Sequence, residues 1–406
     1  MRPFSFGASF LCLVAISSNL LCQENALNSL REWLASKPSD LNWARTESFV
    51  TATIDRQQAE LATGLLWQFF VDLHKIAMKK RIEEKVVVVD DNRLPWLEKR
   101  FGNAPPTGHA LFISMHGGGG APPAVNDRQW QNQIKLYEPA EGIVVAPRAP
   151  TDTWNLWHQA HIDALFDELI FTYAVAEGID TSRVYLMGYS AGGDGVYQLA
   201  PRIADRFAAA CMMAGHPNET QPQGLRNLPF AIFMGGNDSA YKRNEVAGQW
   251  SIKLAELRRA DPNGYEHMVK IYADKGHWMG GNDREGIPWM STFRRREFPD
   301  RVVWRQDDVT HDSFYWIALE SGAPAGTEIV VEIRDNTVSI DGDANGKITL
   351  WLSEQLVNFD QPITVKLKSK VIFNSSVSRS IGNIIKSLNR YRDPKRVCAA
   401  SIQISL

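Results

Sequence analysis

The sequence has little of the chemistry that marks several classes of protein. Its 406 residues include only four cysteines, which follow no zinc-type spacing, so neither a disulfide framework nor a structural zinc site is predicted. The formal net charge is only -2, which argues against a nucleic-acid partner and against a basic membrane-binding patch. Internal repeats and low-complexity linkers are absent. What is present, 44% hydrophobic and 22% charged residues, is typical of a soluble globular protein, and the length favours two domains.

Residues 1–22 carry the pattern of a secretory signal peptide. Arg2 supplies the positive start and Phe10–Ile16 the apolar core, and polar sequence follows from Gln23. The apolar run is too short to span a membrane. We therefore expect a secreted or periplasmic protein without a membrane span. Cys22 would allow a lipid anchor, but Leu21 before it is bulkier than such sites usually accept.

Hydrophobic periodicity divides the rest of the chain into three stretches. Residues 23–106 are predicted as an N-terminal helical lead-in, because apolar side chains recur at spacings of three and four between Leu61 and Ile76. Residues 107–298 alternate short apolar runs with helix-like stretches, which predicts an α/β fold with a doubly wound, mostly parallel sheet. Residues 299–406 hold short strand-like runs separated by turn signals, which predicts a small antiparallel β domain.

The segment Gly188-Tyr189-Ser190-Ala191-Gly192 is the strongest catalytic signal. It reads G-x-S-x-G and lies between an apolar run and a helix-compatible stretch, which is the strand, sharp turn and helix of a nucleophile elbow. A serine hydroxyl is a weak nucleophile until a base, usually a histidine oriented by a carboxylate, removes its proton. The pentapeptide alone is equally compatible with a glycine-rich turn, so the remaining residues must decide.

Elimination identifies a base and an acid in the order serine, acid, histidine. Three histidines follow the serine far enough along the chain: His267 enters a strand-like run, His311 falls in the β domain, and only His277 lies in a loop just after a strand. Asp238 follows a strand end through two glycines, where the acid of such a sheet belongs. Asp274 also lies at a strand end and stays as the alternative acid, although it precedes the histidine by only three residues.

A run of glycines predicts the oxyanion hole. The stretch H-G-G-G-G at residues 116–120 directly follows an apolar strand-like run, and glycines allow a close approach and unusual dihedral angles. We expect one N–H donor from Ala191, the residue after the nucleophile, and a second from Gly117 or Gly118. His116 is expected to support this loop structurally.

Aromatic side chains near these motifs are candidates for substrate binding. Trp278 follows the proposed base, and Trp157 and His158 follow a strand end, although packing roles are equally compatible with the latter two. Asp194 lies in the first turn after the elbow, where a carboxylate stabilises a helix end, so a structural role is predicted. No histidine and carboxylate set completes a metal site, and neither a metal nor a cofactor is expected.

Together these motifs resemble the α/β-hydrolase superfamily, and more narrowly the secreted group around polyhydroxybutyrate depolymerases, feruloyl esterases and related carboxylesterases. The resemblance rests on H-G-G-G-G at 116–120, G-Y-S-A-G-G-D-G at 188–195, G-G-N-D at 235–238 and G-H-W at 276–278. It implies a Ser190–Asp238–His277 triad and hydrolysis of an ester through an acyl-enzyme. The N-terminal helical stretch and the C-terminal β stretch lie outside it.

The expected function is therefore that of a secreted serine hydrolase acting on small-molecule or polymeric carboxylic esters. A serine peptidase of the prolyl-oligopeptidase type is an alternative, but that family usually adds a propeller domain, and the sequence has no blade periodicity. A non-catalytic binding protein on a hydrolase scaffold is the other alternative. The presence of every candidate triad residue disfavours it.

Overall fold

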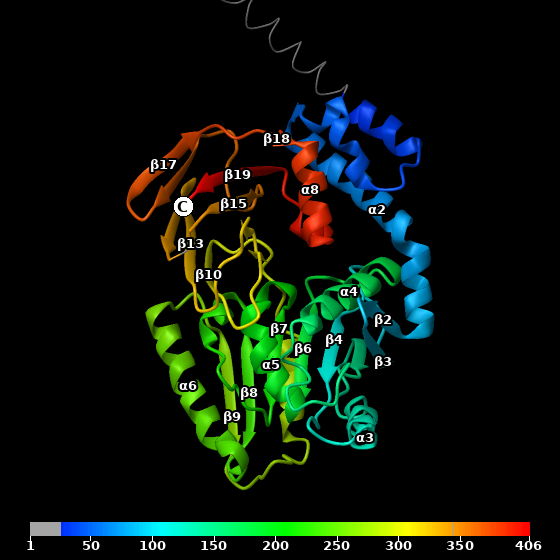
Figure 1. Ribbon diagram of the computed structural model, residues 1–406, viewed down its shortest axis with the longest axis vertical. Coiled ribbons are helices and arrows are strands. Elements are labelled where there is room, and N and C mark those ends of the chain that lie inside the picture. The colour runs from blue at the N-terminus through cyan, green and yellow to red at the C-terminus, as the bar shows by residue number, and fades with distance from the viewer. Residues whose placement is uncertain (1–25, 344) are drawn as a thin grey trace, which may run out of the picture.

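The computed structural model describes residues 26–343 and 345–406 (Figure 1). The predicted signal peptide, residues 1–22, lies outside the described residues. Figure 1 shows a central sheet with its helices in the lower half, the C-terminal sheets above it, and the N-terminal helical segment along the upper right. Within the described part of the chain, no helix is both long enough and apolar enough to cross a bilayer.

An eight-stranded sheet forms the centre of the molecule, in the order β2-β3-β5-β4-β6-β7-β8-β9. The β2–β3 and β3–β5 pairs are antiparallel, and all later pairs are parallel. Every residue of β4 to β8 is buried, because helices cover both faces of a parallel sheet. The strands are β2 (Val86–Val89), β3 (Asn92–Phe101), β4 (Leu111–Met115), β5 (Gly142–Pro147), β6 (Val184–Tyr189), β7 (Ala209–Met213), β8 (Phe230–Gly235) and β9 (His267–Tyr272). The predicted doubly wound, mostly parallel sheet is confirmed.

Two hydrophobic cores lie on opposite faces of this sheet. The first packs β4 and its neighbours against α4, α5 and α6, and continues without a break into the C-terminal sheets. The second lies under the segment after α3 and under α7. Neighbouring residues of one strand enter different cores, as with Phe112 and Ile113, because successive strand side chains point to opposite faces. The helices are α3 (Pro123–Gln133), α4 (His161–Ala176), α5 (Ala191–Arg202), α6 (Arg243–Ala260) and α7 (Gly286–Met290).

The N-terminal segment is helical only in part. A helix ends at residue 35, and α2 (Arg56–Glu84) starts at a capping box in which Asp55 and Gln58 each accept the other's backbone N–H. The predicted lead-in extends to residue 106, but β2 and β3 occupy 86–101 and belong to the central sheet. The four consecutive valines of β2 favour a strand, and an Asp-Asp turn reverses the chain into β3.

The C-terminal segment forms two small sheets. One has the order β10-β13-β14-β16-β17 and the other β11-β12-β15-β19. Their strands are β10 (Arg301–Arg305), β11 (Ser313–Phe314), β12 (Ile317–Leu319), β13 (Glu328–Arg334), β14 (Thr337–Gly342), β15 (Lys347–Leu352), β16 (Ile363–Leu367), β17 (Lys370–Ser375) and β19 (Ala400–Ser405), with α8 (Ile381–Tyr391) between the last two. A further pair joins β1 (Thr53–Ile54) to β18 (Arg379–Ser380).

One strand pair departs from the predicted antiparallel domain. β14 and β16 are parallel, with Thr337 opposite Thr364. Between them the chain crosses to the other sheet to form β15, and such a crossover brings the chain back in its original direction. Seven short 3-10 helices complete the described elements: η1 (Leu41–Thr46), η2 (Ser48–Val50), η3 (Ala204–Arg206), η4 (Pro222–Asn227), η5 (Ala240–Lys242), η6 (Asn282–Glu285) and η7 (Pro394–Arg396).

Candidate active site

The turn between β6 and α5 has the geometry of a strained elbow. Ser190 has φ 59° and ψ -123°, a conformation that costs free energy unless the surroundings enforce it. A Cβ on Gly188 would lie 2.2 Å from the carbonyl oxygen of Gly192, and one on Gly192 would lie 2.1 Å from that of Met115. Glycine is therefore required on both sides of the serine, and the turn presents its hydroxyl at the carboxyl edge of the sheet.

The structure brings together Ser190, His277 and Asp238, the three residues that the sequence analysis selected. Nε2 of His277 lies 2.9 Å from Oγ of Ser190, and Nδ1 lies 2.7 Å from Oδ2 of Asp238. Asp238 is 3% exposed, so only the imidazole can reach its carboxylate from the cleft. In this arrangement Nδ1–H donates to the carboxylate and leaves the Nε2 lone pair facing the serine hydroxyl.

Backbone contacts hold the loop of the acid against the loop of the base. A Cβ on Gly235 would lie 2.0 Å from the carbonyl oxygen of Gly276, and Asn237 N–H donates to the carbonyl of Lys275 at 2.8 Å. Tyr189 adds a side-chain contact, since its hydroxyl donates to the carbonyl of His277 at 2.6 Å. Tyr189 therefore positions the base, and its place beside the nucleophile was the only sequence signal for this role.

The alternative acid, Asp274, lies apart from the imidazole. Its side chain is 75% exposed and pairs with Lys275 at 3.0 Å. A charge that the sequence analysis missed lies on the other side of the selected acid: Nη1 of Arg243 is 3.9 Å from Oδ1 of Asp238. The positive charge of this guanidinium therefore lies beside the buried carboxylate.

Asp194 has a partner that fits its predicted structural role. Its Oδ1 accepts the backbone N–H of His216 at 2.6 Å, which ties the first turn of α5 to the loop after β7. Burial raises the pKa of Asp194 to about 6, and the hydrogen bond from His216 opposes that rise only in part.

The glycine loop after β4 leaves two backbone donors beside the nucleophile. Gly119 N–H donates to Oδ1 of Asn126 at 2.9 Å, and Gly120 N–H donates to the carbonyl of Asp152 at 2.9 Å. Within residues 26–343 and 345–406, the N–H groups of Gly117 and Gly118 have no acceptor. A Cβ on Gly117 would lie 3.7 Å from Oγ of Ser190, so this backbone directly flanks the hydroxyl.

The third predicted donor, Ala191, is the first residue of α5, where an N–H has no acceptor within its own helix. Free N–H groups from two different segments therefore meet at the serine. This is the arrangement that stabilises negative charge on an oxygen at that position.

His116 fixes the orientation of the glycine loop. Nδ1 lies 2.6 Å from the carbonyl oxygen of Gly117, and Nε2 accepts the N–H of Ala149 at 3.1 Å. Burial lowers the pKa of His116 to about 4, so the ring is neutral near pH 7, donating from Nδ1 and accepting at Nε2. Because a trans peptide directs its C=O and N–H in opposite directions, fixing the Gly117 carbonyl aims the Gly118 N–H away from His116.

A cleft of about 540 Å³ opens beside the nucleophile. Its lining combines amide and aromatic side chains with a single lysine and no carboxylate, and comes from the glycine loop, α3 and the segment after it, and the loops of the nucleophile and the base: Gly117, Gly118, Gln129, Asn132, Gln133, Lys135, Leu136, Tyr189, Ser190, His277 and Trp278. Trp278, predicted to face substrate, is 57% exposed. The α3 wall was missed, since this polar helix lacks the apolar periodicity that predicts helices.

Trp157 and His158, the other predicted substrate-binding residues, do not line this cleft. Trp157 is fully buried behind the glycine loop, where its Nε1–H donates to the carbonyl of His116 at 2.9 Å and its ring packs against Gly195. His158 is 6% exposed, and its carbonyl accepts from Arg202. Trp157 is part of the packing that supports the glycine loop, and the ring of His158 packs edge-on against Trp154 with ring centroids 5.4 Å apart.

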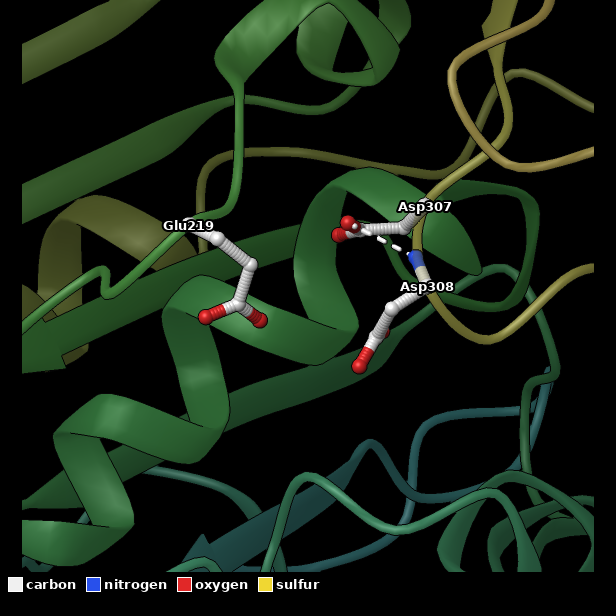
Figure 2. Close-up of side chains that lie close together, drawn as sticks. All are labelled: Glu219, Asp307 and Asp308. Atoms are coloured by element: carbon white, nitrogen blue, oxygen red, sulfur yellow. Dashed lines mark hydrogen bonds between the residues drawn. The ribbon is translucent and has the colours of Figure 1, made fainter.

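One group of carboxylates has the spacing of a metal site. Figure 2 shows Glu219, Asp307 and Asp308, whose oxygens lie within 4.8 Å of one another. Protein donors already engage two of them: Gln198 donates to Glu219 at 3.0 Å, and Thr220 donates to Asp307 at 3.1 Å. Glu219 and Asp308 are exposed, and exposed carboxylates gather in this way without an ion, so the cluster supports no metal assignment.

Comparison with known proteins gives relatives of one chemical class. The chain is 26% identical over 244 residues to feruloyl esterase B of Thermothelomyces thermophilus, covering 47% of this chain and 82% of the relative. It is 29% identical over 144 residues to a bifunctional acetylxylan esterase/xylanase of Neocallimastix patriciarum, covering 34% of this chain and 20% of the relative. A feruloyl esterase B of Neurospora crassa is 27% identical over 30% of this chain and 49% of its own length. The chain thus spans half or less of two of these relatives. No family model matches it.

Solved structures of esterases are also similar. A thermostable esterase has 18% sequence identity and a TM-score of 0.40, covering 52% of this chain and 62% of its own. A mutant of the feruloyl esterase module of Clostridium thermocellum, solved with sinapinate, has 15% identity and a TM-score of 0.35, covering 50% of this chain and 83% of its own. The predicted resemblance to esterases of the α/β-hydrolase superfamily is confirmed by the sequence relatives together with the central sheet described above.

Proposed function

We propose that this protein is a serine hydrolase that cleaves carboxylic esters through an acyl-enzyme on Ser190. The observation that carries the proposal is a single constellation. A serine on a strained elbow lies 2.9 Å from an imidazole whose other nitrogen lies 2.7 Å from a buried carboxylate, beside free backbone N–H groups. Acyl transfer requires a nucleophile, a base, an acid that orients the base, and donors for the oxyanion, and this constellation contains a candidate for each.

In the first half of the reaction, Nε2 of His277 takes the hydroxyl proton as Oγ of Ser190 attacks the ester carbonyl carbon. The carbonyl electrons move onto oxygen, where the N–H groups of Ala191 and of Gly117 or Gly118 stabilise the charge. Asp238 stabilises the imidazolium. When the tetrahedral intermediate collapses, the carbon–oxygen bond to the alcohol breaks, and the alcohol leaves with the proton from His277.

The second half repeats these steps with water. His277 removes a proton from the water as it attacks the acyl carbon, and the same N–H groups hold the second oxyanion. Collapse of that intermediate expels Oγ of Ser190, which recovers its proton from His277, and the free acid is released. This chemistry needs no metal and no cofactor.

The substrate side of the proposal comes from the relatives and the cleft. The relatives are named for acetylxylan and feruloyl esters, so carboxylic esters linked to plant polysaccharides are the first substrates to test. The cleft beside Ser190 is lined by amides and aromatic rings, which suit an acyl group with both polar and apolar parts. We further propose that the chain is exported, with residues 1–22 as its signal.

The test is turnover of p-nitrophenyl acetate together with covalent labelling by a fluorophosphonate. The native enzyme should hydrolyse the ester and gain the mass of the phosphonyl group on Ser190. Ser190→Ala should lose both, with an unchanged thermal unfolding midpoint. Asp274→Asn, at the exposed alternative acid, should keep both. Retained hydrolysis in Ser190→Ala would refute the proposal, and cleavage of peptides in preference to esters would favour a peptidase.

A further inference from the structure

Exposed aromatic rings in this protein lie at one edge of the central sheet. Among the residues whose exposure is described, only three tryptophan, tyrosine or phenylalanine side chains are exposed: Trp154 (63%), Trp278 (57%) and Tyr241 (78%). They lie in the loops that follow β5, β9 and β8, so all three are at the carboxyl edge that carries Ser190. No exposed aromatic side chain is described on the C-terminal sheets or on α2.

Trp278 lines the cleft, but Trp154 and Tyr241 do not, and the strands before them, β5 and β8, lie on opposite sides of β6. Trp154 lies beyond the oxyanion loop: a Cβ on Gly119 would meet its carbonyl oxygen at 3.0 Å, and a Cβ on Gly120 would meet its Cβ at 3.6 Å. Tyr241 follows the triad acid by three residues. The two rings therefore flank the catalytic residues from the sides of the oxyanion loop and of Asp238.

The backbone at the exposed Tyr241 has an energetically unfavourable conformation. Tyr241 has φ 55° and Lys242 has φ 58°, left-handed conformations that are uncommon for residues other than glycine. The guanidinium of Arg243 lies 4.8 Å from the centre of the tyrosine ring, and the same guanidinium lies near Asp238. A strained and supported aromatic ring beside a catalytic group indicates a function in binding.

The polar groups next to Trp154 are neutral amides and hydroxyls, whereas those next to Tyr241 include the cations Lys242 and Arg243 as well as neutral groups. Next to Trp154, Thr153 accepts from the Gln159 amide at 3.0 Å, and the same amide donates to Asn155 at 3.2 Å. Next to Tyr241, Asn237 and Ser239 are exposed. Flat aromatic faces combined with amides and hydroxyls match the apolar C–H faces and hydroxyl rims of sugar rings.

The sheet sets the spacing of the two strands whose following loops carry the rings. β5 and β8 are separated by β4, β6 and β7, so four strand spacings lie between their carboxyl ends, or about 19 Å. Ser190 follows β6, the middle strand of these five. A ligand that reaches from Trp154 to Tyr241 is therefore several sugar rings long, crosses the sheet edge perpendicular to the strands, and has its centre at the nucleophile.

We propose that Trp154 and Tyr241 bind the two ends of a neutral oligosaccharide segment whose central sugar carries the ester cleaved at Ser190. This inference rests on the proposed function and extends it to the alcohol part of the substrate. The acyl group enters the cleft beside α3, while the sugar chain remains on the rim. The two aromatic residues determine specificity for a chain over an isolated sugar, without a part in the chemical step.

The experiment compares p-nitrophenyl acetate with acetylated β-1,4-linked xylo-oligosaccharides, from the monosaccharide to the hexasaccharide. In the native enzyme kcat/KM for the acetylated series should rise with chain length and then level off. Trp154→Ala and Tyr241→Ala should each lower kcat/KM for the longest substrate about tenfold and leave p-nitrophenyl acetate unchanged. Trp154→Phe should recover most of the loss. The matched control is Ile76→Ala, at a side chain 85% exposed on α2, and should change neither activity.

A second measurement separates this inference from the proposed function. Calorimetric titration of Ser190→Ala with unmodified xylo- and cello-oligosaccharides measures binding without turnover. Binding that strengthens with chain length and is lost in the double variant S190A/W154A supports the inference even if the native enzyme hydrolyses none of the esters. Any of three results would overturn the inference. These are an equal kcat/KM for short and long chains, no oligosaccharide binding, and oligosaccharide binding that neither aromatic substitution changes.

Discussion

The carboxyl edge of the central sheet and the interface with the C-terminal sheets are held together by different means. At the edge, positions are set mainly by backbone: glycines in close contact, left-handed dihedral angles, and N–H groups that donate to carbonyls. At the interface, buried ion pairs add to the hydrophobic core that continues across it. Asp205, 1% exposed, accepts from Arg206 and Arg396 at 2.5 Å each, and Arg295 pairs with Asp393 at 2.5 Å.

The difference follows from what each region has to do. An edge that stabilises an oxyanion needs backbone N–H donors that stay free for a substrate. The glycine loop is therefore held through other N–H groups, and those of Gly117 and Gly118 remain without an acceptor among the described residues. An interface needs every buried charge to be satisfied, because an unpaired one is costly. Loss of a charge should therefore damage stability at the interface, and loss of a glycine should damage turnover at the edge.

The largest effect is expected from Asp205→Ala. Burial by itself would raise the pKa of Asp205, but the guanidiniums of Arg206 and Arg396 outweigh it and hold the pKa below its usual range, so the stabilisation is present near pH 7 and is lost as the pH falls. Removing the carboxylate leaves the buried Arg396 guanidinium without its ion-pair partner and leaves Arg206 with Asp167 alone, and should lower the free energy of unfolding by about 3–5 kcal/mol. Urea denaturation at pH 7 measures this.

The control for this prediction is Asp167→Ala, because Asp167 pairs with the same Arg206 but its side chain is 43% exposed. It should cost no more than about 1 kcal/mol. Equal costs for the two substitutions would show that burial of the charge network does not matter at this interface. The folded fraction of Asp205→Ala should keep the native kcat.

The next effect, on turnover, is expected from Gly118→Ala. Gly118 has φ +107°, and a Cβ there would lie 2.1 Å from Oδ1 of Asn126, so the loop must move. Displacing one oxyanion donor should lower kcat by about 10²–10³-fold. Ester turnover under saturating substrate measures the loss. Gly248→Ala is the matched control, since a Cβ in that position of α6 meets nothing within 4 Å. A kcat for Gly118→Ala close to that of the control would remove the glycine loop from the mechanism.

The smallest effect concerns Asp194, where a charge lies at the catalytic edge itself. Because its pKa is raised to about 6, the folded protein holds this proton more tightly than the unfolded chain does, so the stabilisation from this one group is greatest below about pH 4 and falls as the pH rises through 6. The loss is about 2–3 kcal/mol. Asp194→Asn should remove this part of the pH dependence and stabilise the protein at pH 7–8.

Thermal unfolding at intervals between pH 4 and 8 measures the Asp194 effect, with Asp274→Asn as the exposed control. If native and Asp194→Asn curves stay parallel across that window, the buried carboxylate is already compensated by Arg243 and the backbone of His216. The edge would then tolerate a charge as well as the interface does.

Short-range signals in the chain were enough to locate the five central strands, β4 to β8, and the residues that meet at Ser190. The continuous apolar runs of β4 to β8 predict a parallel sheet covered on both faces. The motifs G-x-S-x-G and H-G-G-G-G can be recognised from the strand or helix directly beside them. His277 and Asp238 could be selected because parallel strands deliver their carboxyl ends to one edge. Each of these inferences depends on a pattern a few residues long.

Packing between distant segments decided the rest. Nothing in the sequence says that Trp157 is buried beneath His116 while Trp154, three residues earlier, is exposed, since both follow the same strand. Nor does it say that the polar α3 forms a wall of the cleft, that Tyr189 holds the carbonyl of His277, or that β14 and β16 run parallel. These features depend on contacts between segments that meet only after the sheets and helices have formed. Such contacts are determined by how the surfaces of whole elements pack together, which no short stretch of sequence specifies.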